Sequence, residues 1–302
     1  MVRFGVAGYP PAFYNSIYSK DRIDILKWIR DLKLDAFELQ MTYGPKTLKE
    51  TCIKYRNLAD ELGIKLSIHA AYYIVLTSSD PKKIERSIDT LKRTFELADI
   101  LGVEVVVLHP GSLYGENADN VMRRLVENLN EFFESIGKTT IGLYLETAGK
   151  VGQFGSVDEI LSASRQIEGC HPCIDFGHVN ARSLGKLSDH GEIRKVFDKL
   201  GEYLISAKSK KVHFHYTPIN YGPRGEIGHK ALEDVYPEND QLRLNYDPKK
   251  DKNGAKYYQP RFEPIIEKIR ENKLDCTVIS ETFNSQERGA IAMKECYLRA
   301  IS

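Results

Sequence analysis

Residues 64–73, IKLSIHAAYY, form a short apolar run that ends in a histidine, His69. Segments of helical period flank this run on both sides, which is typical of a buried strand in a chain that alternates strands and helices. A lone histidine after an apolar run is more often a hydrogen-bonded core residue than a ligand. The interpretation therefore depends on whether other strands end in the same way.

The pattern of residues 64–70 recurs along the chain and predicts the fold. Further apolar, β-rich runs occur at residues 2–8, 34–40, 103–110, 141–147, 171–177, 210–216 and 274–281. Amphipathic stretches lie between them, and several end at a glycine that suits a helix C-cap. Eight β/α units in 302 residues predict a (β/α)₈ TIM barrel, with residues 1–302 as a single domain.

Residues 217–261 interrupt this rhythm, because they are rich in Pro, Gly, Tyr and charged residues and have no helical period. We expect a long loop after strand seven. Loops of this length in compact domains are usually functional or disordered. The loop leaves the C-terminal face of the barrel, where barrel enzymes keep their active sites, and this position favours a functional role.

Charge and cysteine content limit the class of protein. The chain has 43 Lys+Arg and 42 Asp+Glu, so no global basic field indicates nucleic acid, although a local patch is compatible with a neutral total. Five cysteines indicate reduced thiols, and CHPC at 170–173 leads into a strand, so we expect a structural role for it. No apolar run predicts a signal peptide or a membrane span, and we expect a soluble cytoplasmic protein.

The C-terminal ends of six successive predicted strands carry histidine, aspartate or glutamate. These residues are His69, His109, Glu146, Asp175 with His178, His213 with His215, and Glu281. In a barrel these ends converge on one mouth, so the side chains can share cations. Nitrogen and carboxylate donors suit Zn²⁺, with Mn²⁺ or Fe as alternatives, and the number of ligands predicts about two or three ions. Such clusters hydrolyse phosphodiesters.

Five motifs in order carry a resemblance to a known family. They are IHAAYYIVLTS (68–78), VVLHPGS (106–112), LYLETAG (143–149), CIDFGHVNA (173–181) and VISET (278–282). Together they resemble the endonuclease IV family, AP endonuclease family 2, within the xylose-isomerase-like TIM barrels. The resemblance implies a zinc-dependent hydrolase of DNA repair that cleaves damaged double-stranded DNA 5′ to abasic sites. We expect a monomer.

The resemblance also implies a ligand set. His69, His109 and Glu146 would hold one metal, and Glu146 would bridge to a second held by Asp175, His213 and Glu281, with Glu146 and Glu281 as the catalytic residues. His215 is an additional candidate ligand, because the strand period of two places it on the same face as His213.

The third metal site departs from the family pattern. The family combines the histidine matched by His178 with an Asp-x-His pair, which is absent after strand seven here. The nearest counterpart is GEIGH, so we expect a remodelled site of His178, Glu226 and His229. Tyr72 falls where the family places an aromatic that probes damaged DNA, and packing under a loop is the alternative. Two further departures concern DNA binding. The family's Gly-Ala-His-like motif on the first strand is replaced by GVAGYPP, and the loop after the second strand, where the family has an Arg that enters the duplex, reads LQMTYGPKT.

A second class of function uses part of the same set. Related barrels isomerise or epimerise sugars with a single divalent ion held by four residues, here Glu146, Asp175, His213 and Glu281. The two glutamates would then act as acid and base. His69 and His109 have no role in a one-metal isomerase, and their presence favours the nuclease. A catalytically silent, metal-stabilised scaffold is a third alternative.

Overall fold

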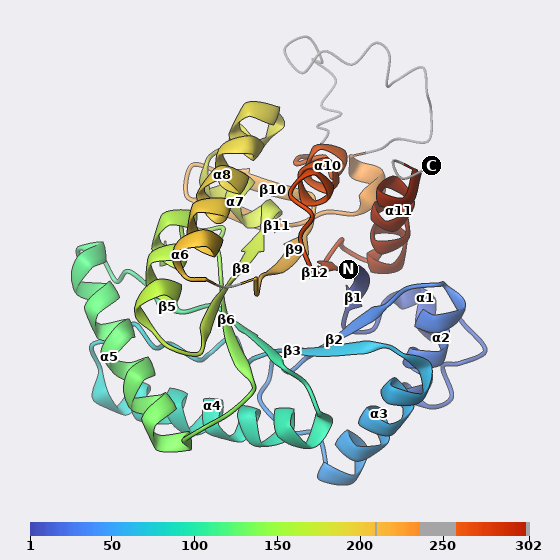
Figure 1. Ribbon diagram of the computed structural model, residues 1–302, viewed down its shortest axis with the longest axis horizontal. Helices are drawn as coiled ribbons and strands as arrows, with labels where there is room; N and C mark the ends of the chain where they lie inside the picture. The colour runs from blue at the N-terminus through green and yellow to red at the C-terminus, as the bar shows by residue number, and fades with distance from the viewer. Residues whose placement is uncertain (209, 236–257, 300–302) are drawn as a thin grey trace.

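Eight parallel strands form a closed barrel in the computed structural model, which describes residues 1–208, 210–235 and 258–299. The strand order around the barrel is β1-β12-β9-β8-β6-β4-β3-β2 (Figure 1). The strands are β1 (Val2–Ala7), β2 (Ala36–Gln40), β3 (Lys65–His69), β4 (Val105–Leu108), β6 (Gly142–Glu146), β8 (Cys170–Asp175), β9 (His213–Tyr216) and β12 (Cys276–Ser280). Each overlaps one of the predicted runs, so the TIM barrel is confirmed.

Helices cover the outside of the barrel (Figure 1). They are α1 (Pro11–Tyr14), α2 (Ile25–Asp31), α3 (Lys49–Leu62), α4 (Pro81–Leu101), α5 (Ala118–Ile136), α6 (Val157–Gln166), α7 (Phe176–Arg182), α8 (His190–Ser206), α10 (Glu263–Glu271) and α11 (Gln286–Arg299), with 3₁₀ turns η1 (Arg22–Asp24), η2 (Lys186–Ser188) and η3 (Leu232–Asp234). Gly63 and Gly102 end α3 and α4 in the left-handed conformation, as the C-cap signals predict. None of the helices in the described part of the chain has the length and apolarity needed to span a membrane.

The alternation of side chains along each strand divides the barrel into two regions. On β9, Phe214 and Tyr216 belong to the large apolar core between strands and helices. His213 and His215 alternate with them and contact glutamates of other strands inside the barrel. The same alternation on β2 places Phe37 in the core outside the barrel and Glu38 in the barrel interior. The barrel interior therefore carries polar groups, whereas the faces of the strands that point toward the helices are apolar.

A short hairpin occupies the first part of the loop expected after strand seven. Strand β10 (Ile219–Gly222) pairs antiparallel with β11 (Gly225–His229), and Gly225 adopts a left-handed φ of 91° at the start of β11. These strands are too short for an alternating apolar pattern, so the hairpin has no strand signal in the sequence. The rest of the expected loop includes residues 236–257, which lie outside the described residues. A second small sheet joins β5 (Gly111–Ser112) to β7 (Gln153–Phe154).

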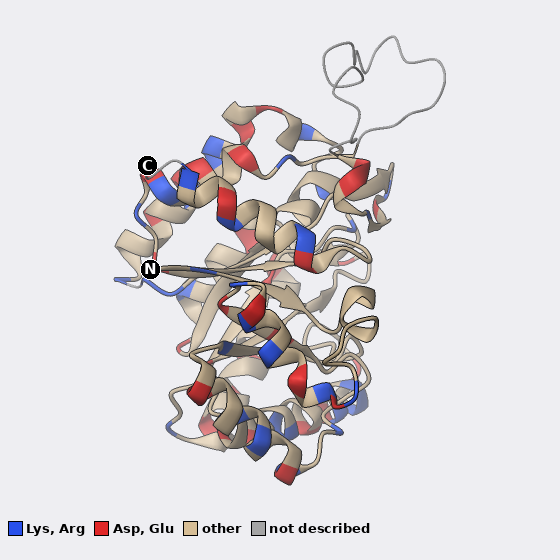
Figure 2. Cartoon of the chain, turned by 90° about the vertical axis from the view of Figure 1, so that its right-hand side faces the viewer, with Lys and Arg blue, Asp and Glu red and all other residues tan. Residues whose placement is uncertain are grey.

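Charged residues of both signs are interspersed on the surface. Figure 2 shows acidic and basic positions mixed along the outer helices on the face in view. This distribution agrees with the formal charge of +1 for the whole chain.

Candidate metal centre

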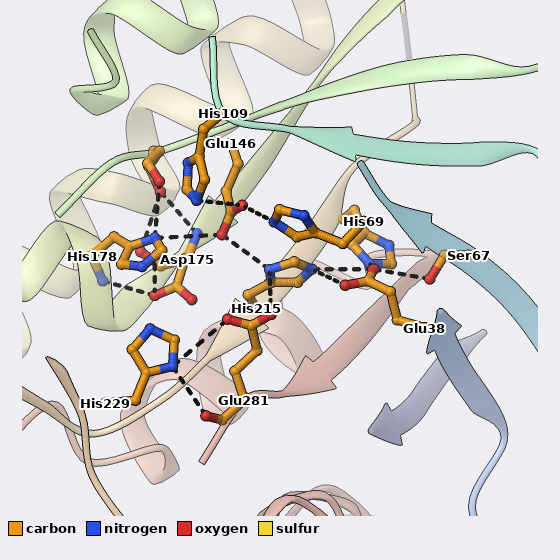
Figure 3. A network of polar contacts seen from close by, with 12 residues as sticks. Glu38, Ser67, His69, His109, Glu146, Asp175, His178, His215, His229 and Glu281 are labelled. Carbon is orange, nitrogen blue, oxygen red and sulfur yellow. Dashed lines mark hydrogen bonds and ion pairs between the residues drawn. The ribbon is translucent and has the colours of Figure 1, made fainter. Parts of the chain in front are cut away.

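Among the described residues, four groups of histidine and carboxylate side chains lie close enough together to hold an ion. One contains Glu38, His213 and His215, and the other three meet at the C-terminal ends of the barrel strands (Figure 3). The first of these three comprises His69, His109 and Glu146, from β3, the end of β4 and β6, which are neighbouring strands. The Nε2 atoms of His69 and His109 lie 3.0 and 3.1 Å from Oε2 of Glu146. Two imidazoles and one carboxylate oxygen thus converge on one point.

The second group shares Glu146 with the first. It comprises Glu146, Asp175, His215 and Glu281. Nδ1 of His215 lies 3.0 Å from Oε1 of Glu146 and 3.6 Å from Oε1 of Glu281. Glu146 therefore directs Oε2 to the first group and Oε1 to the second, which is the arrangement of a carboxylate able to bridge two cations.

The third group comprises His178, Glu226 and His229. Nε2 of His178 and Nε2 of His229 each lie 3.7 Å from a carboxylate oxygen of Glu226. The β10–β11 hairpin brings Glu226 and His229 to the mouth, and the backbone N–H of Glu226 donates to the carbonyl of Gly149 at 3.0 Å. The three residues expected to replace the family's third site are thus brought together.

The structure corrects the expected position of His213. Its Nε2 lies 3.1 Å from Oε2 of Glu38, whereas His215 lies beside Glu146 and Glu281. Both histidines face the barrel interior, but two residues advance a parallel strand by about 6.6 Å. Only the later residue, His215, therefore reaches the level of the second group.

Glu38 is a buried polar residue that the strand-end pattern did not indicate. It is 0% exposed and accepts hydrogen bonds from Ser67, Gln40, His213 and His215. The expected ligands stand at the ends of strands, whereas Glu38 stands in the middle of one. The available signal was an acidic residue between apolar neighbours, within AFEL of the run LDAFELQ.

Cys173 also lies close to Glu146 and His215. Burial raises the pKa of its thiol, so the neutral form is favoured over the thiolate that binds metals. Cys170 and Cys173 are both buried in β8, in agreement with a structural role for CHPC.

The electrostatics of the mouth suit the binding of cations. Burial raises the pKa of Glu281, and the nearby Glu146 carboxylate adds to this rise against the opposing effect of His215. Burial alone would raise the pKa of Glu146, but the surrounding histidines lower it well below its usual value. Burial alone would lower the pKa of His69, but its contact with Glu146 raises it to about 9. Within the described residues, the buried Oδ2 of Asp175 has no hydrogen-bond partner. Crowded carboxylates and an unpartnered buried oxygen fit a site for divalent cations.

Tyr72 follows the end of β3 by three residues and is 65% exposed. Its ring contacts Tyr43 and Tyr73 edge-on, with centroid separations of 6.1 and 5.7 Å. The alternative of Tyr72 packing under a loop does not agree with this exposure.

Comparison with known sequences relates the chain to a family of barrel enzymes. A family model described as xylose isomerase-like TIM barrel matches residues 26–300. An uncharacterized protein of Methanocaldococcus jannaschii is 30% identical over 236 residues, which are 78% of this chain and 83% of that protein. A probable endonuclease 4 of Bacillus subtilis is 26% identical over 239 residues, covering 72% of this chain and 77% of the relative.

Solved structures share the fold over almost the whole chain. Endonuclease IV of Thermus thermophilus aligns with a TM-score of 0.65 at 17% identity and 99% coverage of each chain. A D-psicose 3-epimerase of Clostridium cellulolyticum aligns with a TM-score of 0.62 at 14% identity, covering 99% of this chain and 96% of that one. The resemblance to the endonuclease IV family is confirmed, but the fold alone is common to nucleases and epimerases.

Proposed function

Because the chain belongs to the xylose isomerase-like TIM barrel family, we propose that it is a metal-dependent hydrolase that cleaves DNA 5′ to abasic sites. The observation that carries this proposal is the sharing of Glu146. One of its oxygens faces His69 and His109, and the other faces His215. This arrangement suits at least two cations, and two-cation sites are typical of phosphodiester hydrolysis.

The donor atoms favour Zn²⁺, with Mn²⁺ or Fe as alternatives, because imidazole and carboxylate ligands suit these ions. We assign about two or three ions. His69, His109 and Glu146 would hold the first; Glu146, Asp175, His215 and Glu281 the second; His178, Glu226 and His229 the third. When bound, such ions would act as Lewis acids that activate water and stabilise the leaving oxygen of the phosphodiester.

Glu146 and Glu281 are the proposed catalytic residues, with different roles. The Glu146 side chain is 0% exposed, so it holds its position at the centre of the site. The Glu281 side chain is 12% exposed and faces the mouth. This partial exposure favours Glu281 as the carboxylate that accepts a proton from water.

The proposed substrate is damaged double-stranded DNA. A nucleotide without its base costs less to turn out of the helix, so the mouth can admit it more readily than an intact nucleotide. The exposed ring of Tyr72 could stack on bases beside the lesion. The relatives named probable endonuclease 4 support this substrate. We propose that the protein acts in DNA repair as a cytoplasmic monomer.

The second candidate function is a divalent-metal-dependent sugar isomerase or epimerase. Glu146, Asp175, His215 and Glu281 form a four-residue group of the kind that holds one ion, and an epimerase shares the fold. Glu146 and Glu281 would then be the acid and base. This function leaves the convergence of His69 and His109 on Glu146 without a role.

A paired measurement of metal content and activity tests the proposal. Protein purified without chelator is analysed for zinc, manganese and iron per chain. It is then incubated with a duplex that contains one abasic-site analogue, with the intact duplex as control. About two or three ions per chain and incision only of the damaged duplex are expected. A single ion per chain, with interconversion of ketoses and no incision, would favour the epimerase.

A further inference from the structure

Three histidines at the mouth have their ring orientation fixed by the backbone. Nδ1 of His69, His178 and His229 each contacts a carbonyl oxygen; the carbonyls are those of Ala70 at 2.9 Å, Thr147 at 3.0 Å and Glu281 at 3.2 Å. A carbonyl only accepts, so Nδ1 must carry the hydrogen and donate it. In the neutral ring, the Nε2 lone pair is then free to face the site.

His215 has the opposite orientation. Its Nδ1 faces Oε1 of Glu146 at 3.0 Å, and its Nε2 lies 3.3 Å from Oε2 of Glu38. For Nδ1 to offer a lone pair to a cation, Nε2 must carry the hydrogen. The partner of Nε2 is a carboxylate in place of a backbone carbonyl. On the side of the ring away from Glu146, the hydrogen on Nε2 of His215 is thus held by a side chain, Glu38.

We propose that Glu38 is a positioning residue that holds His215 in the form able to bind a cation through Nδ1. The inference rests on the proposed metal-dependent function. Carboxylates only accept hydrogen bonds, and both ring nitrogens of His215 face one. When a cation takes the place of the hydrogen on Nδ1, Glu38 would keep the remaining hydrogen on Nε2. Carboxylates behind metal-binding histidines fix the ring form and orientation in this way.

The surroundings of Glu38 hold its carboxylate in place. Ser67 Oγ donates to Oε2 at 2.9 Å, and His213 Nε2 approaches the same oxygen at 3.1 Å. Gln40 Nε2 donates to Oε1 at 3.2 Å. These contacts surround a carboxylate in the barrel interior, where Glu38 is 0% exposed. His213 therefore supports Glu38, which explains a buried histidine one level below the mouth.

The negative charge of Glu38 also favours the binding of cations at the mouth. The three groups contain the carboxylates of Glu146, Asp175, Glu226 and Glu281. Glu38 adds a further negative charge behind His215, which offsets repulsion among several divalent cations. Replacing Glu38 by Gln keeps the size of the side chain, but removes this charge. The Gln amide also has only one acceptor oxygen for two imidazole rings.

The test compares the full chain, Glu38→Gln and the control Ser67→Ala, which removes a donor to Glu38 without contacting the His215 ring. Zinc affinities are measured by competition with a chromophoric chelator, and ¹⁵N–¹H spectra report the protonated ring nitrogen of each histidine. We expect zinc-loaded wild type to carry hydrogen on Nε2 of His215. Glu38→Gln should bind the ion of the second group about 10- to 100-fold more weakly. Ser67→Ala should change this affinity much less.

The outcomes separate the inference from the proposed function. A wild-type chain that binds no divalent cation would refute both. A chain that binds zinc but carries hydrogen on Nδ1 of His215 would overturn the role of Glu38 alone. Unchanged zinc affinity in folded Glu38→Gln would do the same. If Glu38→Gln does not fold, a wild-type spectrum with hydrogen on Nδ1 of zinc-bound His215 would still refute the role of Glu38.

Discussion

Nδ1 of His215 lies 3.0 Å from Oε1 of Glu146, although β8 separates their strands in the barrel. The other oxygen of Glu146 faces His69 and His109. Glu146 is thus the contact between two groups of candidate ligands that come from different parts of the chain. Metal content and activity should therefore depend on the Glu146 carboxylate that the first two groups share, and on the third group, His178, Glu226 and His229.

Replacing Glu146 by Gln should reduce incision of abasic DNA by at least about 100-fold and lower metal content, because the amide cannot serve two cations as a carboxylate does. The fold should persist, since Glu146 is at the mouth and outside the apolar core. Single-turnover incision, metal analysis and thermal unfolding measure the three effects. Near-normal turnover with unchanged metal content would refute the shared role of Glu146.

His69→Ala and His109→Ala should each lose an ion and most nuclease activity, because each removes one of two imidazoles facing Oε2 of Glu146. His190→Ala is the control, since this exposed histidine belongs to none of the three groups. Metal content and incision are measured on the same preparations. If both variants retain full metal content and activity, the first group has no catalytic role.

The double variant Glu226→Ala, His229→Ala should lose the third ion and keep the first two, because only His178 of that group remains. Crystals of both proteins are measured at the metal absorption edge. An anomalous peak within coordination distance of both side chains, absent from the variant, is the expected result. Glu226 and His229 side chains turned to solvent in metal-loaded wild type would contradict it.

Gly149→Ala should weaken the binding of the third ion, because the added methyl group would displace Glu226. A Cβ at Gly149 would lie 2.7 Å from Cβ and 2.8 Å from Oε2 of Glu226, so that side chain must move. Gly152→Ala is the matched control, because its added Cβ meets no atom within 4 Å. Titration with zinc should show weaker binding of one ion in Gly149→Ala alone. Equal zinc affinities in the two variants would argue against Glu226 as a ligand.

Tyr72→Ala should weaken binding to abasic duplex by about 1–3 kcal/mol if its ring stacks on one base. Its 65% exposure predicts little change in thermal unfolding. Tyr72→Phe keeps the ring and should bind nearly as wild type does. Fluorescence anisotropy with labelled duplex measures these affinities. Equal binding by all three proteins would show that Tyr72 does not contact the DNA.

The sequence by itself determined the barrel and most of the ligand types. Apolar runs and helical periods are local signals, and each predicted run contains a barrel strand or most of one. Strand ends of a barrel meet at one face, so His69, His109 and Glu146 could be assigned to one place before their contacts were known. The single-domain assignment of residues 1–302 stays a prediction.

The tertiary structure decided which of the interior residues meet. The strand period places His213 and His215 on the same face, but their depth relative to Glu146 depends on the stagger between β9 and β6. The contacts of Glu38 had no local signal, because its partners on other strands lie 29 to 177 residues away in the sequence. Likewise, a hairpin too short to show a strand pattern brings Glu226 to His178. Local periodicity fixes the direction of a side chain, whereas contacts between distant strands require the closed barrel.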